Sequence, residues 1–129
     1  MNKVLQPPGW PRARGYSQGI AAQGTQVFVS GQIGWNTSFE FETDEFVAQA
    51  RAALQNVLTV LAEAGGGPQH ITRMVWYVVS RAQYLACQKE LGPAYRGIMG
   101  DHYPSMTAVQ VCALMEDRAL LEIEATAVI

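Results

Sequence analysis

The C-terminal stretch Leu120–Ile129 constrains the fold most, because apolar and polar side chains alternate along it. One set of alternate positions is apolar and consists of Leu121, Ile123, Ala125, Ala127 and Ile129. The positions between them include Glu122, Glu124 and Thr126. Alternation with a period of two is typical of a β-strand that buries one face. The stretch therefore predicts a strand with one face on a core and one polar face.

A second extended segment, 106–114, precedes this strand and is separated from it by the charged turn Met115–Arg118. One of its faces would carry Thr107, Val109, Val111 and Ala113, and the other Met106, Ala108, Gln110 and Cys112. We expect the two segments to pair as a hairpin whose apolar face packs on helices. The opposite face would be mixed in polarity, which suits a subunit interface or a pocket.

The N-terminal part begins with the Pro-rich residues 1–11, which predict an extended arm. The whole chain, 1–129, is expected to form one domain. Segments 16–22 and 26–31 flank a Gly-containing turn and are predicted to pair as a hairpin.

The middle of the chain predicts two helices and one strand. Thr43 is the expected N-cap of an amphipathic helix that ends at Gly65–Pro68. Segment 71–79 is apolar at most positions on both faces, which is typical of a central strand. Ser80–Gln83 matches a capping box for a second helix. Gly92–Pro93 predicts a kink or a break in that helix.

The resulting order is ββαβαββ, an α+β arrangement with one mixed sheet. Right-handed crossovers would place both helices on the same sheet face. The other face would have no cover within the chain and is expected to carry Met74, Trp76, Ala108, Gln110 and Glu124. Because 49% of the residues are hydrophobic and only 16% are charged, other copies of the chain are the expected cover.

Charge and cysteine usage exclude several classes of function. The net charge is −2 and the basic residues are scattered, which argues against a nucleic-acid partner. No stretch approaches the ~20 apolar residues of a membrane span, so we expect a cytoplasmic protein without a membrane partner. The two His and two Cys residues lack the spacing of metal ligands. Neither a metal nor an organic cofactor is therefore expected.

Several motifs resemble the RidA/YjgF family, also called the endoribonuclease L-PSP or reactive intermediate deaminase family. They are Tyr16–Gln18, Phe28–Ile33, Gln55–Leu58, Ala62–Gly65 and Leu121–Ala127, and the resemblance covers residues 7–129. It implies a chorismate-mutase-like fold and a homotrimer whose sheets form a barrel-like core. It also implies small-molecule sites in clefts between subunits, where enamines and imines such as 2-aminoacrylate are hydrolysed to a keto acid and ammonia.

The resemblance places candidate site residues at three points of the chain. Glu122 matches the family Glu that helps to place the attacking water, and Tyr16 matches a pocket Tyr. Ser30 and Gly31 match pocket backbone. Pro104–Thr107 resembles the family motif that contains a carboxylate-binding Arg. Met106 stands where that Arg would be. Met106 and the next residue, Thr107, are both candidate substrate-binding residues. Met cannot replace the bidentate hydrogen bonds of Arg, so a different substrate is expected.

Three functions remain open on the sequence. The first is an enamine or imine deaminase acting on a substrate other than the usual 2-aminoacrylate-type acid. The second is a trimer that binds a metabolite without catalysis, and the third, which the acidic composition disfavours, is an endoribonuclease or translation inhibitor.

Single residues also have alternative interpretations. Glu122 could be a solvated strand carboxylate, and Tyr16 could be a packing aromatic. Trp35 could be a cleft residue or a loop anchor, and His102 could be an anion donor or an exposed loop residue. Arg73 could form an ion pair with Glu124.

Overall fold

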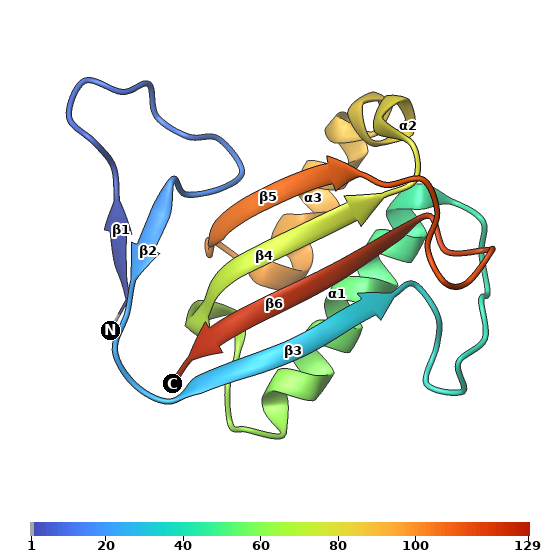
Figure 1. The fold of residues 1–129 in the computed structure, drawn as a ribbon, viewed down its shortest axis with the longest axis horizontal. Coiled ribbons are helices and arrows are strands. Elements are labelled where there is room, and N and C mark those ends of the chain that lie inside the picture. The colour runs from blue at the N-terminus through green and yellow to red at the C-terminus, as the bar shows by residue number, and fades with distance from the viewer. Residues whose placement is uncertain (1) are drawn as a thin grey trace.

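The computed structural model describes residues 2–129 and shows a mixed β-sheet with helices on one of its faces (Figure 1). The α+β class and the placement of the helices are as predicted. Met1, the first residue of the predicted arm, lies outside the described residues. No helix in residues 2–129 is long and apolar enough to cross a membrane. The elements are β1 Lys3–Leu5, β2 Gly19–Ala21, β3 Gln26–Ile33, α1 Phe46–Ala62, a 3₁₀ turn Pro68–His70, β4 Ile71–Val78, α2 Arg81–Ala86, α3 Gln88–Met99, β5 Ser105–Gln110 and β6 Leu121–Val128.

The main sheet has the strand order β3-β6-β4-β5, with β4 and β5 parallel and the other pairs antiparallel. The predicted alternation of β6 is confirmed, because Leu121, Ile123, Ala125 and Ala127 are all buried. Segment 71–79 does form an interior strand, β4. The predicted hairpin between 106–114 and 120–129 is wrong, because β4 lies between β5 and β6. Alternation shows which face of a strand is buried but does not identify its neighbour.

The connection between β5 and β6 explains this difference. β5 ends at Gln110, earlier than predicted, and the following loop passes the end of β4. Val111 N–H donates to the Val78 carbonyl at 2.8 Å, and Val79 N–H donates to the Leu120 carbonyl at 3.2 Å. The loop therefore bridges the end of β4, and β6 returns on its other side.

The predicted N-terminal hairpin is also wrong. β2 pairs with β1 in a separate two-stranded sheet, and β3 pairs with β6. Thr25, in the turn before β3, instead exchanges two backbone hydrogen bonds with Ile129, at 2.8 and 2.9 Å. The N-terminal segment is thus more than an extended arm: residues 3–21 form a hairpin-like arm that stands beside the sheet (Figure 1).

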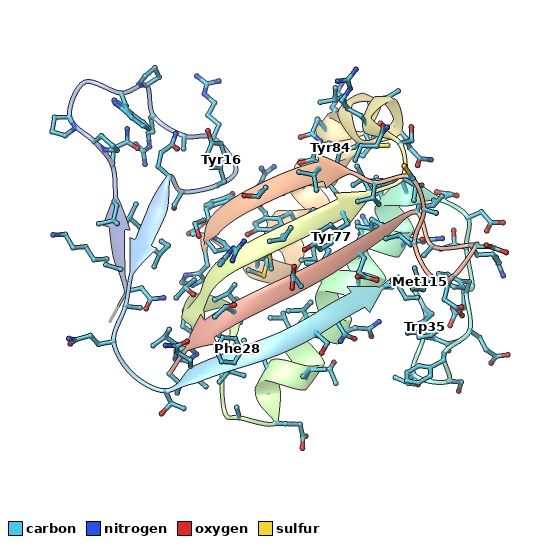
Figure 2. All side chains as sticks on the ribbon, in the orientation of Figure 1. Tyr16, Phe28, Trp35, Tyr77, Tyr84 and Met115 are labelled. Carbon is cyan, nitrogen blue, oxygen red and sulfur yellow. The ribbon has the colours of Figure 1, made fainter. Side chains whose placement is uncertain are left out.

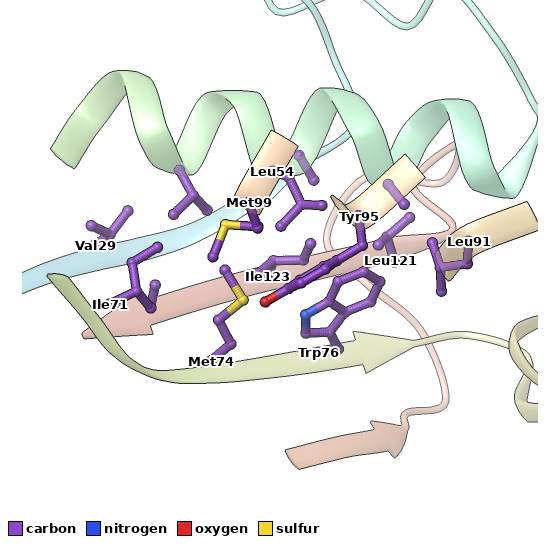
Figure 3. Close-up of a cluster of buried hydrophobic side chains, with 14 of the residues drawn as sticks. Val29, Leu54, Ile71, Met74, Trp76, Leu91, Tyr95, Met99, Leu121 and Ile123 are labelled. Atoms are coloured by element: carbon purple, nitrogen blue, oxygen red, sulfur yellow. The ribbon is translucent and has the colours of Figure 1, made fainter. Parts of the chain in front are cut away.

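The core lies between the sheet and the helices α1 and α3 (Figure 3). Leu54 and Leu61 of α1 pack there with Leu91 and Met99 of α3. Met74 and Trp76, which we expected on the uncovered face, belong to this core and are 0% and 1% exposed. β4 is apolar on both faces, so its sequence does not fix which face turns inward. The structure turns its Met and Trp toward the helices.

Two helix boundaries differ from the prediction. α1 begins at Phe46, and Thr43 is not its N-cap, although the Thr43 hydroxyl accepts a hydrogen bond from Glu45 N–H at 3.0 Å. The second helix breaks at Cys87, not at Gly92–Pro93, which lies inside α3. The Ser80 cap is confirmed, since its hydroxyl accepts from Gln83 N–H at 3.1 Å. α3 therefore continues past Pro93, which has no N–H to donate to the Lys89 carbonyl one turn earlier.

Gly97 and Gly100 give a matched test of α3. A Cβ on Gly97 would meet nothing within 4 Å, whereas Gly100 has a positive φ of 64°. Gly97→Ala should raise the free energy of unfolding by about 0.5–1 kcal/mol, because Gly is a poor helix former. Gly100→Ala should lower it by about 1 kcal/mol through backbone strain. Urea unfolding of both variants measures this; a destabilising Gly97→Ala would mean that another surface covers this part of α3.

Candidate functional site

A cavity of about 360 Å³ lies beside the edge strand β5, between the sheet, the helices α2 and α3, and the arm. Figure 2 shows Tyr16 on the arm and Tyr84 on α2 near this edge. Met106 and Ala108 of β5 face it, because they pair in register with the core residues Met74 and Trp76. The remaining lining residues are Arg14, Gly15, Trp76, Gln88, Leu91, Gly92, Tyr95, Arg96 and Tyr103.

The arm reaches the cavity because Ser17 is fastened to the start of β5. Ser17 N–H donates to the Pro104 carbonyl at 3.0 Å, and its hydroxyl donates to the Tyr103 carbonyl. Ser17 and Ser105 also form an isolated parallel bridge. These contacts bring the two predicted site residues Tyr16 and Met106 into the same cavity.

Aromatic side chains form the inner wall of the cavity. Tyr95 stacks on Tyr103 with ring centroids 5.5 Å apart, and Trp76 meets Tyr84 edge-on at 6.2 Å. Burial raises the pKa of the Tyr84 and Tyr95 phenols, so both stay neutral at physiological pH. The Tyr95 hydroxyl donates to the His102 carbonyl at 2.9 Å. The wall therefore offers flat apolar surface and few free polar groups.

The inner wall also contains a hydrogen-bond donor without a partner. Trp76 Nε1 is buried and makes no hydrogen bond within residues 2–129. Indole N–H is a donor only, and a buried donor without an acceptor costs about 1–3 kcal/mol. Because Trp76 Nε1 is fully enclosed, neither a water molecule nor a ligand atom in the cavity reaches it in this conformation.

On the open face of the sheet, Glu122 lies directly against Gly31. A Cβ on Gly31 would overlap the Glu122 carboxylate, with its Cδ at 2.7 Å and its Cγ at 2.9 Å. The β3–β6 register shifts between Val29 and Gln32, so this Gly occupies a bulge. The missing side chain makes the space in which the carboxylate lies. The structure thus brings Gly31 and Glu122 together, and Ser30 adjoins them as an exposed residue.

Other residues of the open face are arranged differently from our expectation. Glu124 accepts a short hydrogen bond from the Tyr77 hydroxyl, and this bond raises the pKa of that Tyr. Glu124 does not form an ion pair with Arg73 within residues 2–129. Thr107 lies on the open face, because it pairs with Val75, whose neighbours Met74 and Trp76 point to the helices.

The predicted site residues therefore form two separate groups in one chain. Tyr16 and Met106 line the cavity on the helix side of the sheet, whereas Gly31 and Glu122 lie on the open face. β4 separates β5 from β6, so the two groups are also on different strands of the sheet. Neighbouring residues on a strand point to opposite faces, so the side chains of Met106 and Thr107 lie on opposite faces of the sheet. A single chain does not assemble the complete predicted site.

Trp35 and His102 do not line the cavity. Trp35 stacks on Phe39 at 4.6 Å, and its carbonyl accepts from Asn56 Nδ2 at 2.9 Å, which is the arrangement of a loop anchor. His102 lies along a separate groove between the arm and the sheet. Among residues 2–129, no group of three or more His, Cys, Asp and Glu side chains could hold a metal ion.

Sequence reasoning missed the aromatic wall and Arg96 as site residues. Tyr84, Tyr95 and Arg96 lie in the segment of the predicted second helix, and no motif in the sequence marks them as site residues. A clue was available in the spacing, because Gln88, Gly92 and Arg96 repeat every four residues and share one helix face. That face lines the cavity.

The fold and its two groups of site residues define a class of small α+β proteins with one open sheet face. The family model for Endoribonuclease L-PSP matches residues 10–129. The reactive intermediate deaminase TdcF of Escherichia coli (strain K12) is 31% identical over 99% of this chain and 98% of its own length. The 2-iminobutanoate/2-iminopropanoate deaminase of Salmonella typhimurium is 29% identical with the same coverage. The structure of the Rid protein YyfB from Yersinia pestis superposes with a TM-score of 0.84 at 28% identity, covering 99% of this chain and 98% of that one.

The chain therefore belongs to the RidA/YjgF family. The match begins within the arm and includes every element of the main sheet.

Proposed function

We propose that this protein hydrolyses an enamine or imine other than the usual 2-aminoacrylate-type acid. The observation that carries this proposal is the contact of Glu122 with Gly31, which fixes a carboxylate on the open sheet face. Relatives named as reactive intermediate deaminases support the same chemistry. Met106, in the position where the resemblance places the carboxylate-binding Arg, supports the change of substrate.

The proposed reaction needs one water molecule and one base. An enamine first takes a proton on carbon and becomes an iminium ion, which is the protonated imine. Water then adds to the imine carbon, and Glu122 accepts a proton from this water. The resulting carbinolamine loses ammonia when its nitrogen is protonated and its hydroxyl gives up a proton, and a carbonyl product remains. A positioned carboxylate performs this kind of proton transfer.

We also propose that the working form is a homotrimer in which the two groups of residues meet across a subunit boundary. Tyr16 and Met106 of one subunit would face Gly31 and Glu122 of the next. The uncovered sheet face supports this, since Phe28 there is 72% exposed. A face that is partly apolar and has no cover in its own chain is typical of an interface.

The proposed homotrimer can be tested by measuring its mass in solution. Light scattering coupled to size exclusion should give about three times the chain mass of 14.1 kDa. A mass of one chain that persists on concentration would contradict the shared site, because neither group of residues is complete alone.

A non-catalytic trimer that binds a metabolite is the second candidate. It is favoured by the same Met106, since loss of an anion-binding side chain weakens capture of an acid substrate. Ribonuclease activity is disfavoured: the chain has an acidic pI of about 5.6, and the cavity offers only two cations.

Ammonia release separates the two candidates. Imines of graded size that carry no carboxylate on the imine carbon, generated in the cuvette by a flavin-dependent amine oxidase, should lose ammonia faster with the protein than without it. The acceleration should be greater for larger imines than for 2-aminoacrylate, which is produced by a pyridoxal-phosphate enzyme. Equal rates with and without the protein for every imine would favour the binding function.

A further inference from the structure

We propose that the cavity beside β5 binds a planar, conjugated substrate through a negative group held by Arg96 and Arg14. The anion-binding position would thus have moved from strand β5 to helix α3 and the arm. This inference rests on the proposed function for the reaction, whereas its claim about binding is tested separately. It names a substrate class: aromatic or conjugated acids whose anionic group lies away from the reacting carbon.

Arg96 lines the cavity one helical turn after Gly92, which lines it too. Arg96 Nη1 lies 3.5 Å from the point that a Cβ on Gly92 would occupy. The guanidinium therefore folds back along α3 toward the cavity. At this distance a Cβ on Gly92 would make an ordinary van der Waals contact with the guanidinium, so the approach does not depend on Gly.

Arg14 approaches the same cavity from the arm. It precedes Gly15, whose φ of 78° turns the chain just before Tyr16 and the fastened Ser17. Within residues 2–129, neither Arg14 nor Arg96 forms an ion pair or a side-chain hydrogen bond. An unpaired guanidinium has five donors in a planar fork that matches a carboxylate or a phosphate.

The ionised side chains that line the cavity all carry positive charge. There are two of them, both arginines, and none of the lining residues is Asp or Glu. Two cations that converge on one cavity without a carboxylate raise the local concentration of anions and disfavour cations. The lining therefore selects a negatively charged ligand even though the chain as a whole has a charge of −2.

The aromatic wall and the volume of the cavity indicate the shape and size of the uncharged part of the ligand. Four aromatic side chains, Trp76, Tyr84, Tyr95 and Tyr103, form that wall. Aromatic rings prefer stacked or edge-on neighbours. A volume of about 360 Å³ is that of a pocket for a ligand larger than a three-carbon acid.

Calorimetric titration with stable probes tests the binding claim on the full-length protein. Phenylacetate should bind at least ~10-fold more tightly than its neutral isostere phenylacetamide, and more tightly than acetate. Arg96→Gln should weaken phenylacetate binding by ~10- to 100-fold, because charged hydrogen bonds are lost, and should leave phenylacetamide unchanged. Arg51→Gln is the matched control, since Arg51 is an exposed arginine of α1 outside the cavity.

The outcomes separate this inference from the proposed function. Equal binding of phenylacetate and phenylacetamide, or an unchanged affinity in Arg96→Gln, would overturn the inference. Binding that depends on Arg96 without hydrolysis of any imine would support the inference and overturn the proposed function. Hydrolysis of negatively charged aromatic imines at the same rate in wild type and Arg96→Gln would leave the function standing and reject the inference. Arg96→Lys should restore part of the affinity, because the charge returns without the planar fork.

Discussion

Glu122→Gln should lower kcat/KM for imine hydrolysis by roughly 10²- to 10⁴-fold, the usual contribution of a positioned general base. Gln has almost the same shape as Glu, so it fits the same space against Gly31. It lacks the charge that accepts a proton from water. Because the substitution changes little else, folding and assembly should be preserved. Ammonia release under substrate-limited conditions measures the ratio directly.

Glu124→Gln is the matched control for this experiment. Glu124 lies two residues further along β6 on the same open face. Its carboxylate accepts from the Tyr77 hydroxyl, and the carbonyl oxygen of Gln can accept in the same way. We expect kcat/KM of this variant to stay within a few-fold of wild type. If both variants lose activity equally, the effect belongs to the charge of the open face and not to Glu122.

Gly31→Ala tests the same geometry without touching the carboxylate. The new methyl group would overlap the Glu122 side chain and displace it. A comparable loss of activity with an intact fold would show that the position of the carboxylate matters. The experiment therefore tests whether the proposed base, Glu122 of β6, depends on the β3 bulge for its position.

The strands and helices of the fold were predictable where one face of an element differs from the other. β6 alternates along its whole length, and α1 carries an apolar stripe, so both were found. β4 is apolar on both faces, and its inward face was predicted wrongly for that reason. Pairing was predicted least well. No feature of the segments at β5 and β6 reveals that β4 runs between them, since the alternation of side chains marks the buried face of a strand and not its pairing partner.

The candidate site was predictable only in part. The contact of Gly31 with Glu122 follows from two motifs far apart in the chain, and the family resemblance joined them. Their separation from Met106 by the sheet required the strand order. Tyr84 and Tyr95 could not be assigned to a cavity from sequence, because an apolar helix face packs equally well on a core or around a ligand.

Met106→Arg should raise the hydrolysis of 2-aminoacrylate by roughly 30-fold to several thousand-fold, starting from a low rate in the wild-type protein. An ion-pair anchor in a closed site is worth ~2–5 kcal/mol, and this free energy corresponds to that range of rates. Met106 is half-buried and lines the cavity next to the small Ala108, so the longer side chain has space. Release of pyruvate and ammonia measures the gain.

Two further variants determine what a gain in the Met106→Arg protein means. Met106→Gln has a polar side chain of similar length without charge, and it should leave the low rate unchanged. The double variant Met106→Arg/Glu122→Gln should lose the gained activity, because the anchor would hold the substrate without a base to activate water. A wild-type protein that already hydrolyses 2-aminoacrylate as fast as Met106→Arg would contradict the prediction, and Arg96 would then be the side chain to test as its carboxylate anchor. A folded Met106→Arg variant that stays inactive would instead favour a trimer that binds its ligand without catalysis, since charge complementarity would then be present without chemistry.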